Sequence, residues 1–98
     1  MKLVCDKKES SMTIAVEGRL DTVTAPELDK IISEDLENVT DLILDLAALE
    51  YISSAGLRVI LKAQKLMNAK GSMSVANAND GVREIFDITG FADILTLI

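Results

Sequence analysis

Hydrophobic and more polar residues alternate one by one near the start of the chain. Met12, Ile14 and Val16 are separated by single residues, which is the period of a strand with one buried face. A similar segment over residues 2–8 precedes them, and only a two-residue polar tip lies between the two. Such a short connection predicts an antiparallel hairpin formed by residues 2–8 and 11–18.

A helical spacing of apolar residues follows this hairpin. Leu28, Ile31 and Ile32 recur at intervals of three and four residues. Thr24 stands where an N-cap belongs, and Glu27 three residues later completes a capping box. The pattern therefore predicts a helix that begins directly after Thr24.

The rest of the chain continues this alternation of strands and helices. The predicted elements are strands over residues 42–46 and 72–76, helices over 54–69 and from Asn79 to about Gly90, and a possible last strand over 94–98. Strands that alternate with helices favour parallel pairing with right-handed crossovers. We therefore expect one α/β domain over residues 1–98, with a mixed, mostly parallel sheet, an N-terminal hairpin and helices mainly on one face.

The helix predicted over residues 54–69 has two distinct faces. The helical period assigns to the core Leu57, Ile60, Leu61 and Met67. Arg58 and Lys62 fall on the solvent face, and Gly71 is expected to end the helix as a left-handed cap.

Composition and charge exclude several classes of function. The net charge is −6, which argues against nucleic acid as a partner, and the chain has no histidine and one cysteine. Without histidine, the chain lacks the commonest general base and the commonest zinc ligand. Cys5 lies in an alternating segment and is interpreted as a small core residue. We therefore expect no metal site and no serine–histidine hydrolase.

No motif for a nucleotide or a membrane is present either. The five glycines form neither a P-loop nor a dinucleotide-binding fingerprint, so we expect no cofactor and no enzyme. Apolar runs are too short for a membrane span, and the N-terminus lacks the apolar core of a signal peptide. These observations favour a cytoplasmic protein without membrane insertion.

Two consecutive serines mark the most informative position of the chain. Ser53 and Ser54 follow a buried strand and a short break, and they precede a helix. Free backbone N–H groups and the positive end of the helix dipole lie at such a position, so a serine there either caps the helix or is a place where a phosphate is held. Arg58 lies one turn after Ser54 and is within reach of such a phosphate or of a partner's carboxylate.

Two aspartates lie near predicted strand ends. Asp21 and Asp45 are candidates for a site beside the serines, because ligands of open α/β sheets gather at the carboxyl ends of strands. The alternative, which the sequence favours, is that each carboxylate caps a turn of its own backbone.

Three blocks of sequence together resemble the STAS domain family, in particular the small bacterial anti-sigma factor antagonists. The blocks are Gly18-Arg19-Leu20-Asp21, the segment from Leu42 to Leu46 that leads to Ile52-Ser53-Ser54-Ala55-Gly56-Leu57, and the segment from Val82 to Phe91. Their order and spacing cover nearly the whole chain.

The resemblance implies a regulator of transcription rather than an enzyme. Such antagonists bind an anti-sigma factor that is also a serine kinase and thereby free a sigma factor. The kinase phosphorylates one serine of the antagonist, which then dissociates, and a metal-dependent serine phosphatase resets it. Counted from Gly56, the family's phosphorylated serine corresponds to Ser54, and Asp21 matches an acidic residue of the neighbouring loop. The expected partner-binding residues are therefore Asp21, Ser53, Ser54, Gly56 and Arg58.

Two positions depart from the family pattern. The usual aspartate before the phosphorylated serine is Ser53 here, which leaves Ser53 as a second candidate acceptor. Where the family has a hydroxyl residue directly after the phosphorylated serine, this chain has Ala55, which removes another candidate acceptor. A second hypothesis is a STAS module that works without phosphorylation, as a docking part of a larger regulatory or transporter-associated complex.

Overall fold

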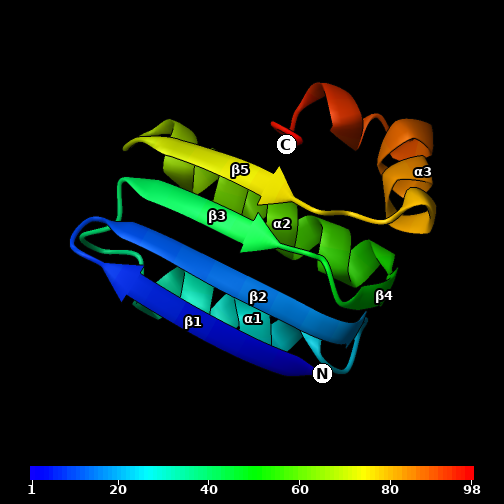
Figure 1. Cartoon of the computed structure of the whole chain (residues 1–98), viewed down its shortest axis with the longest axis horizontal. Coiled ribbons are helices and arrows are strands. Elements are labelled where there is room, and N and C mark those ends of the chain that lie inside the picture. The colour runs from blue at the N-terminus through cyan, green and yellow to red at the C-terminus, as the bar shows by residue number, and fades with distance from the viewer.

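The computed structural model, which describes residues 1–98, has a five-stranded sheet with helices behind it in the view of Figure 1. Its elements in chain order are β1 (Lys2–Lys8), β2 (Ser11–Leu20), α1 (Ala25–Glu34), β3 (Asp41–Asp45), β4 (Leu49–Ile52), α2 (Ser54–Asn68), β5 (Ser72–Ala76), α3 (Asp80–Thr89) and the short 3₁₀ helix η1 (Phe91–Asp93). β1 pairs antiparallel with β2, and all other pairs are parallel. The predicted α/β class, hairpin and mixed sheet are confirmed.

The long strand β2 has two successive parallel partners on one side. Its first half, Ser11 to Ala15, pairs with β3, while its end, Gly18 to Leu20, pairs with β4. The register shifts between Gly18 and Arg19, where β2 passes from one partner to the other. β4 was not predicted, because its burial pattern does not alternate and its four residues are too few for a recognisable period. This added strand brings the chain before the two serines against the end of β2.

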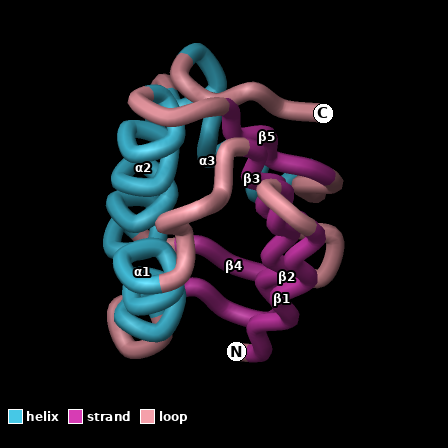
Figure 2. The backbone as a smooth tube through the Cα atoms, turned by 90° about the vertical axis from the view of Figure 1, so that its left-hand side faces the viewer, coloured by secondary structure: helices cyan, strands magenta, loops and turns pink.

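Two helices form a layer on one face of the sheet, as Figure 2 shows edge-on, while α3 lies at one end of the sheet beside β4. Between the layers, 24 buried hydrophobic residues form one cluster. Phe86 of α3 is fully buried, and every other member is aliphatic or methionine. Helices mainly on one face were expected, and the structure has this arrangement.

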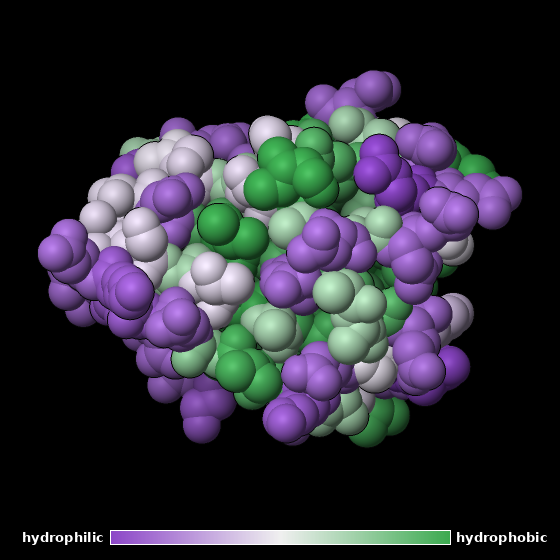
Figure 3. All heavy atoms as spheres, in the orientation of Figure 1, coloured by the Kyte–Doolittle hydropathy of each residue, from purple (hydrophilic) through white to green (hydrophobic).

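No helix covers the opposite face of the sheet. The register sets one row across it as Val4, Ala15, Asp45 and Ala76, and the next as Asp6, Thr13, Ile43 and Ser74. Figure 3 shows this face with apolar side chains interrupted by hydrophilic ones. Small and polar side chains break up the apolar area, so the face tolerates water.

Gly71 does not act as the predicted left-handed cap. Its φ is not positive, and α2 ends instead at Ala69 in a right-handed conformation. The glycine is needed for a close approach, because a Cβ atom there would lie 1.8 Å from the carbonyl oxygen of Thr40. The turn after α2 thus passes directly against the residue that precedes β3.

Two residues that were assigned to the core lie elsewhere. Cys5 is exposed, because β1 is the edge strand and the helices leave it at the rim. The thiol is nevertheless partly desolvated, which raises its pKa, and the Asp35 carboxylate makes a smaller contribution in the same direction. Leu61 is only partly buried, since it stands at the margin of the apolar face of α2. Leu57, Ile60 and Met67 are buried as predicted.

The strand expected over residues 94–98 is not formed. Only an isolated bridge joins Leu97 to Val75, although the amide of Val75 donates to the Thr96 carbonyl at 2.8 Å and the amide of Ile98 donates to the Val75 carbonyl at 2.9 Å. The segment therefore covers part of the free edge of β5.

Candidate functional site

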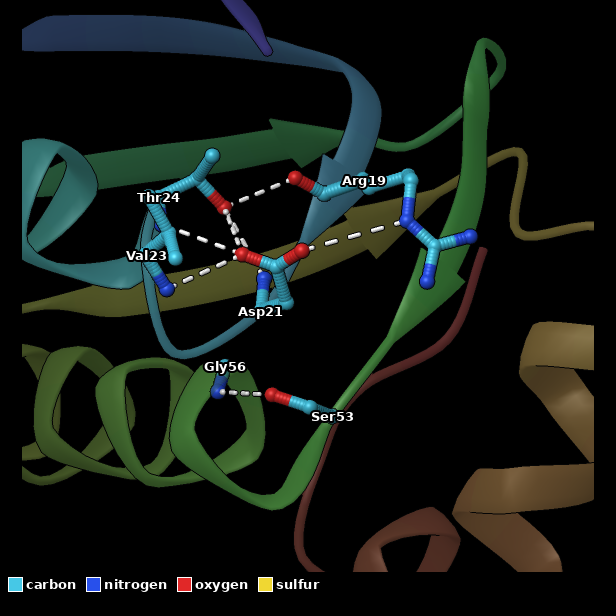
Figure 4. A network of polar contacts seen from close by, with 6 residues as sticks. All are labelled: Arg19, Asp21, Val23, Thr24, Ser53 and Gly56. Carbon is cyan, nitrogen blue, oxygen red and sulfur yellow. Dashed lines mark hydrogen bonds and ion pairs between the residues drawn. The ribbon is translucent and has the colours of Figure 1, made fainter.

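The candidate site lies where two neighbouring parallel strands end. Leu20 of β2 is paired with Ile52 of β4, and the amide of Ser53 donates to the Leu20 carbonyl at 2.9 Å. Asp21 and Ser53, the residues that follow this pair, therefore leave the sheet side by side, as Figure 4 shows. The structure thus brings the predicted aspartate and the two serines to one edge of the sheet.

A glycine sets how closely α2 approaches this edge. A Cβ atom at Gly56 would lie 2.7 Å from Leu20 Cγ, 2.9 Å from Ile52 Cγ1 and 2.9 Å from the Leu20 carbonyl oxygen. Atoms this close overlap, so only glycine lets the first turn of α2 rest on the ends of β2 and β4. Gly56 is buried, so its observed role is to set the position of the first turn of α2.

The structure assigns different places to the two serines. Ser53 is the N-cap of α2, and its hydroxyl accepts a long hydrogen bond of 3.5 Å from the Gly56 amide. Ser54 is the first residue of the helix and is exposed, and its hydroxyl makes no hydrogen bond within the chain. No side chain of the protein is hydrogen-bonded to the Ser54 hydroxyl as a general base, so the protein itself does not activate this hydroxyl as a nucleophile.

Asp21 organises the loop that joins β2 to α1. Its Oδ1 accepts hydrogen bonds from the amides of Val23 at 3.0 Å and Thr24 at 3.1 Å, and the Thr24 hydroxyl oxygen lies 3.2 Å from it. The Thr24 amide is the largest cause that lowers the pKa of this carboxyl, and the nearby Arg19 guanidinium acts in the same direction. The carboxylate is thus occupied by its own loop and makes no hydrogen bond to either serine.

Thr24 stands at the N-cap of α1, but its side chain does not cap the helix. Its hydroxyl donates to the Arg19 carbonyl at 2.7 Å and accepts from the Asp21 amide at 2.9 Å. The predicted capping box is therefore wrong, because Thr24 closes the preceding loop instead.

Sequence reasoning missed three residues around this loop. The Arg19 guanidinium lies 4.3 Å from the centre of the Tyr51 ring, and its Nε is 3.8 Å from Asp21 Oδ2. Tyr51 escaped notice because its strand was not predicted. Val23 is 83% exposed, and an apolar residue in a connecting loop gives no periodic signal. Val23 thus lies in the loop beside Asp21, whereas Arg19 and Tyr51 meet on the face of the sheet that no helix covers, because their neighbours Leu20 and Ile52 are the buried residues.

Asp45 is the last residue of β3, and its side chain caps the turn that follows. Its Oδ1 accepts from the Ala47 amide at 3.0 Å and from Asn77 Nδ2 at 3.1 Å. Both aspartates thus cap turns of the backbone, as the sequence favoured, and only Asp21 stands next to the serines.

Arg58 folds back toward the start of its helix. Its Nε donates to the Ser54 carbonyl oxygen at 3.4 Å, and the guanidinium forms no ion pair with any carboxylate of the chain. The predicted proximity of Arg58 and Ser54 is therefore present in the structure. The guanidinium is free for an anion on Ser54 or on a partner.

Other classes of site find no support in the geometry. No group of three or more His, Cys, Asp or Glu side chains is arranged to hold a metal ion. None of the helices combines the length and the hydropathy that crossing a lipid bilayer demands.

The sequence is similar to regulators of bacterial sigma factors. Residues 2–98 match the family described as the STAS domain. The anti-sigma-B factor antagonist of Bacillus subtilis is 28% identical, over 93% of this chain and 84% of its own. BtrV of Bordetella bronchiseptica, provisionally named an anti-sigma factor antagonist, is 34% identical over 96% of this chain and 83% of its own.

Solved structures share the fold. An anti-sigma factor antagonist from Mycobacterium paratuberculosis superposes with a TM-score of 0.88 at 23% identity, and covers 98% of this chain and 83% of its own. The antagonist SpoIIAA, known in an unphosphorylated and a phosphorylated form, gives TM-scores of 0.79 and 0.78 at 19% identity, over 99% of this chain and 87% or 91% of its own. A sulfate transporter family protein from Wolinella succinogenes gives 0.77 at 16% identity, over 88% of this chain and 71% of its own.

Proposed function

The chain belongs to the STAS domain family, and from that premise we propose that it is an anti-sigma factor antagonist whose partner binding is switched off by phosphorylation of Ser54. Its homologues are named as antagonists of anti-sigma factors, which makes an anti-sigma factor the expected partner. The exposed, unbonded hydroxyl of Ser54 is the observation that carries the proposal.

The free protein tolerates a phosphate at this position. Phosphorylation adds a charge of about −1.5 to −2 at neutral pH. Ser54 is the first residue of α2, where the helix dipole favours negative charge, and Arg58 already lies beside it. Ser53 rather than Ser54 caps the helix, so modification of Ser54 removes no hydrogen bond of the fold. We therefore expect the fold to survive phosphorylation.

The complex does not tolerate the same phosphate. A partner surface shaped for a neutral serine would have to bury a doubly charged group or hold it near its own carboxylates. A loss of about 1.4 kcal/mol already weakens binding tenfold. Selective weakening of the complex, with the fold intact, is what a reversible switch requires.

The loop beside the serines offers an exposed apolar side chain to a partner. Val23 is 83% exposed, and hydrogen bonds to Asp21 hold the loop that carries it. A preordered loop loses little conformational entropy when it binds. We propose that the anti-sigma factor, which is also the serine kinase, contacts this loop and the first turn of α2, and that a serine phosphatase reverses the modification.

The test uses the anti-sigma factor encoded in the source genome as a purified partner. Its affinity is measured for the wild-type chain, Ser54→Asp and Ser54→Ala, and release is followed after ATP is added. Ser54→Asp should bind at least tenfold more weakly. Ser54→Ala should bind as well as wild type and resist release by ATP.

Ser53→Ala is the matched control, because it removes a neighbouring hydroxyl that makes only a long contact. It should bind and be released as wild type does. Phosphorylation and release of Ser54→Ala at the wild-type rate would exclude Ser54, and Ser53 would then be the acceptor to examine. Absence of any complex with the anti-sigma factor would overturn the proposal as a whole.

A docking module that works without phosphorylation is the second candidate. It is favoured by Ser53, which stands where the family pattern has an aspartate beside the acceptor. The mass of the protein isolated from its native cells separates the two hypotheses. A fraction heavier by one phosphate supports the switch, and a uniformly unmodified protein under all growth conditions supports the module.

A further inference from the structure

A surface groove runs along α2 on the side opposite its buried residues. Its volume is about 440 Å³, and its lining is Arg58, Leu61, Lys62, Lys65, Leu66 and Ala69. Leu66 is 40% exposed and Leu61 is only partly buried. These leucines are not needed to fill the core, so the exposed apolar area has no explanation in the fold.

Two of the three basic residues in the groove form no ion pair within the chain. Lys62 donates to Asp29 and to Ser33 of α1, at 2.7 Å each, and is thereby used within the chain. Arg58 and Lys65 form no ion pair. Arg58 and Lys65 lie one above the other on the surface of α2, with Leu61 on one side of them and Leu66 on the other. On a chain whose net charge is −6, this surface is complementary to an apolar segment with negative charges.

We propose that this groove binds an acidic amphipathic helix of the protein partner, with its leucines against Leu61 and Leu66 and its carboxylates against Arg58 and Lys65. The proposal rests on the proposed function only for the identity of that partner. The groove is open and lies along one helix, which suits a second helix packed beside it.

The spacing of the cations defines the ligand further. Arg58 and Lys65 are seven residues apart on one helix, which corresponds to about 10 Å along its axis. A partner helix therefore needs two carboxylates seven residues apart, with apolar residues between them at positions three and four. This pattern distinguishes an amphipathic acidic helix from a merely acidic tail.

The groove is continuous with the proposed switch. Ser54 lies one turn before Arg58, and the Arg58 guanidinium already contacts the backbone of Ser54. A phosphate on Ser54 would compete with the partner's carboxylate for the same guanidinium. Phosphorylation of Ser54 would thus weaken binding of the partner helix in the groove, in addition to causing repulsion at the serine itself.

The experiment uses a synthetic helical peptide of about 18 residues, long enough to be helical in water. It has glutamates seven residues apart with leucines between them, and a scrambled peptide of the same composition is the control. Binding to the isotope-labelled chain is followed by amide chemical shifts and by fluorescence anisotropy at low and high salt. Shifts should cluster on α2 from Arg58 to Ala69, and the scrambled peptide should bind more weakly.

Charge reversal tests the cations. Lys65→Glu should weaken binding of the peptide about fivefold at low salt, with a smaller effect at high salt. Lys8→Glu makes the same change of net charge on the exposed edge strand β1 and should leave binding unchanged. Shifts that map outside α2, or equal effects of Lys65→Glu and Lys8→Glu, would overturn the proposal.

A chain with phosphoserine at position 54, made by chemical ligation, tests the competition. It should bind the peptide more weakly than the unmodified chain, and Arg58→Gln should remove most of that difference. Equal binding by both forms would refute the competition for Arg58. No kinase or anti-sigma factor is present in these measurements, so a negative result here leaves the Ser54 switch standing, and failure of the switch leaves the groove standing.

Discussion

Replacing Gly56 by alanine tests how α2 is seated at the site. The added Cβ would lie 2.7 Å from Leu20 Cγ and 2.9 Å from the Leu20 carbonyl oxygen, whereas ordinary contact begins at 3.4 Å. One of these atoms belongs to the backbone of a paired strand, so the overlap is not relieved by a side-chain rotation alone. The first turn of α2 must therefore move away from β2 and β4.

The expected magnitude follows from two opposing effects. Alanine is favoured over glycine within a helix by at most about 1 kcal/mol. Overpacking in a tightly packed region costs about 1–3 kcal/mol. We therefore expect Gly56→Ala to lower the free energy of unfolding by about 1–2 kcal/mol, in other words to lower Tm by roughly 4–16 °C for a domain of this size. Because Ser54 lies on the displaced turn, binding of the anti-sigma factor should also weaken.

Gly81→Ala is the matched control for this change. Gly81 also lies in the first turn of a helix, and a Cβ there would meet only Asn79 Oδ1, at 3.4 Å. The same gain in helix propensity then acts without the overlap, and the variant should be as stable as wild type or more so. Equilibrium urea unfolding measures both variants. If Gly56→Ala proves as stable as Gly81→Ala, the close approach of α2 to the strand ends does not constrain the site.

Three further changes probe other parts of the structure. Gly71→Ala would place a Cβ 1.8 Å from the Thr40 carbonyl oxygen, so it should destabilise more than Gly56→Ala in the same urea assay, and an equal or smaller effect would contradict the contact. The pKa of Asp21 is lowered on folding from 3.8, so the carboxylate stabilises the fold at pH values above 3.8 and loses this effect as the pH falls through the folded pKa. Asp21→Asn should therefore lose less stability than wild type between neutral and acidic pH, and identical pH profiles would refute this role. Leu61→Ala should cost less than the roughly 2–5 kcal/mol of a buried leucine, because Leu61 is only partly buried, and a cost in that range would show that it belongs to the core.

Much of the architecture was predictable because strong periods mark it. The alternation around Ile14 and the apolar run over residues 42–46 gave strands at nearly the observed bounds, and the helix predicted from residue 54 begins at Ser54. β4 was not predictable in the same way. Its burial pattern places Leu49 and Ile52 inside with two exposed residues between them, and only pairing with β2 makes it a strand.

The site was predictable as a set of residues but not as a set of contacts. Sequence indicated that one serine caps α2 and the other is accessible, but backbone geometry decides that Ser53 is the cap. Asp21 was placed beside the serines correctly, yet its carboxylate is used by Val23 and Thr24 of its own loop. Such local hydrogen bonds compete with helix capping, and residue types alone do not settle that competition.

The pairing of β2 with β4 also means that the surface at this site exists only in the folded chain. The loop with Asp21 and Val23 and the turn with Ser54 lie about thirty positions apart in the chain, with α1 and β3 between them. They meet only after β4 has joined the sheet. Under the proposed switch, a kinase that must contact both segments would phosphorylate only the folded chain. An unfolded chain, a fragment or a nascent polypeptide presents the serine without the loop and would not be a substrate.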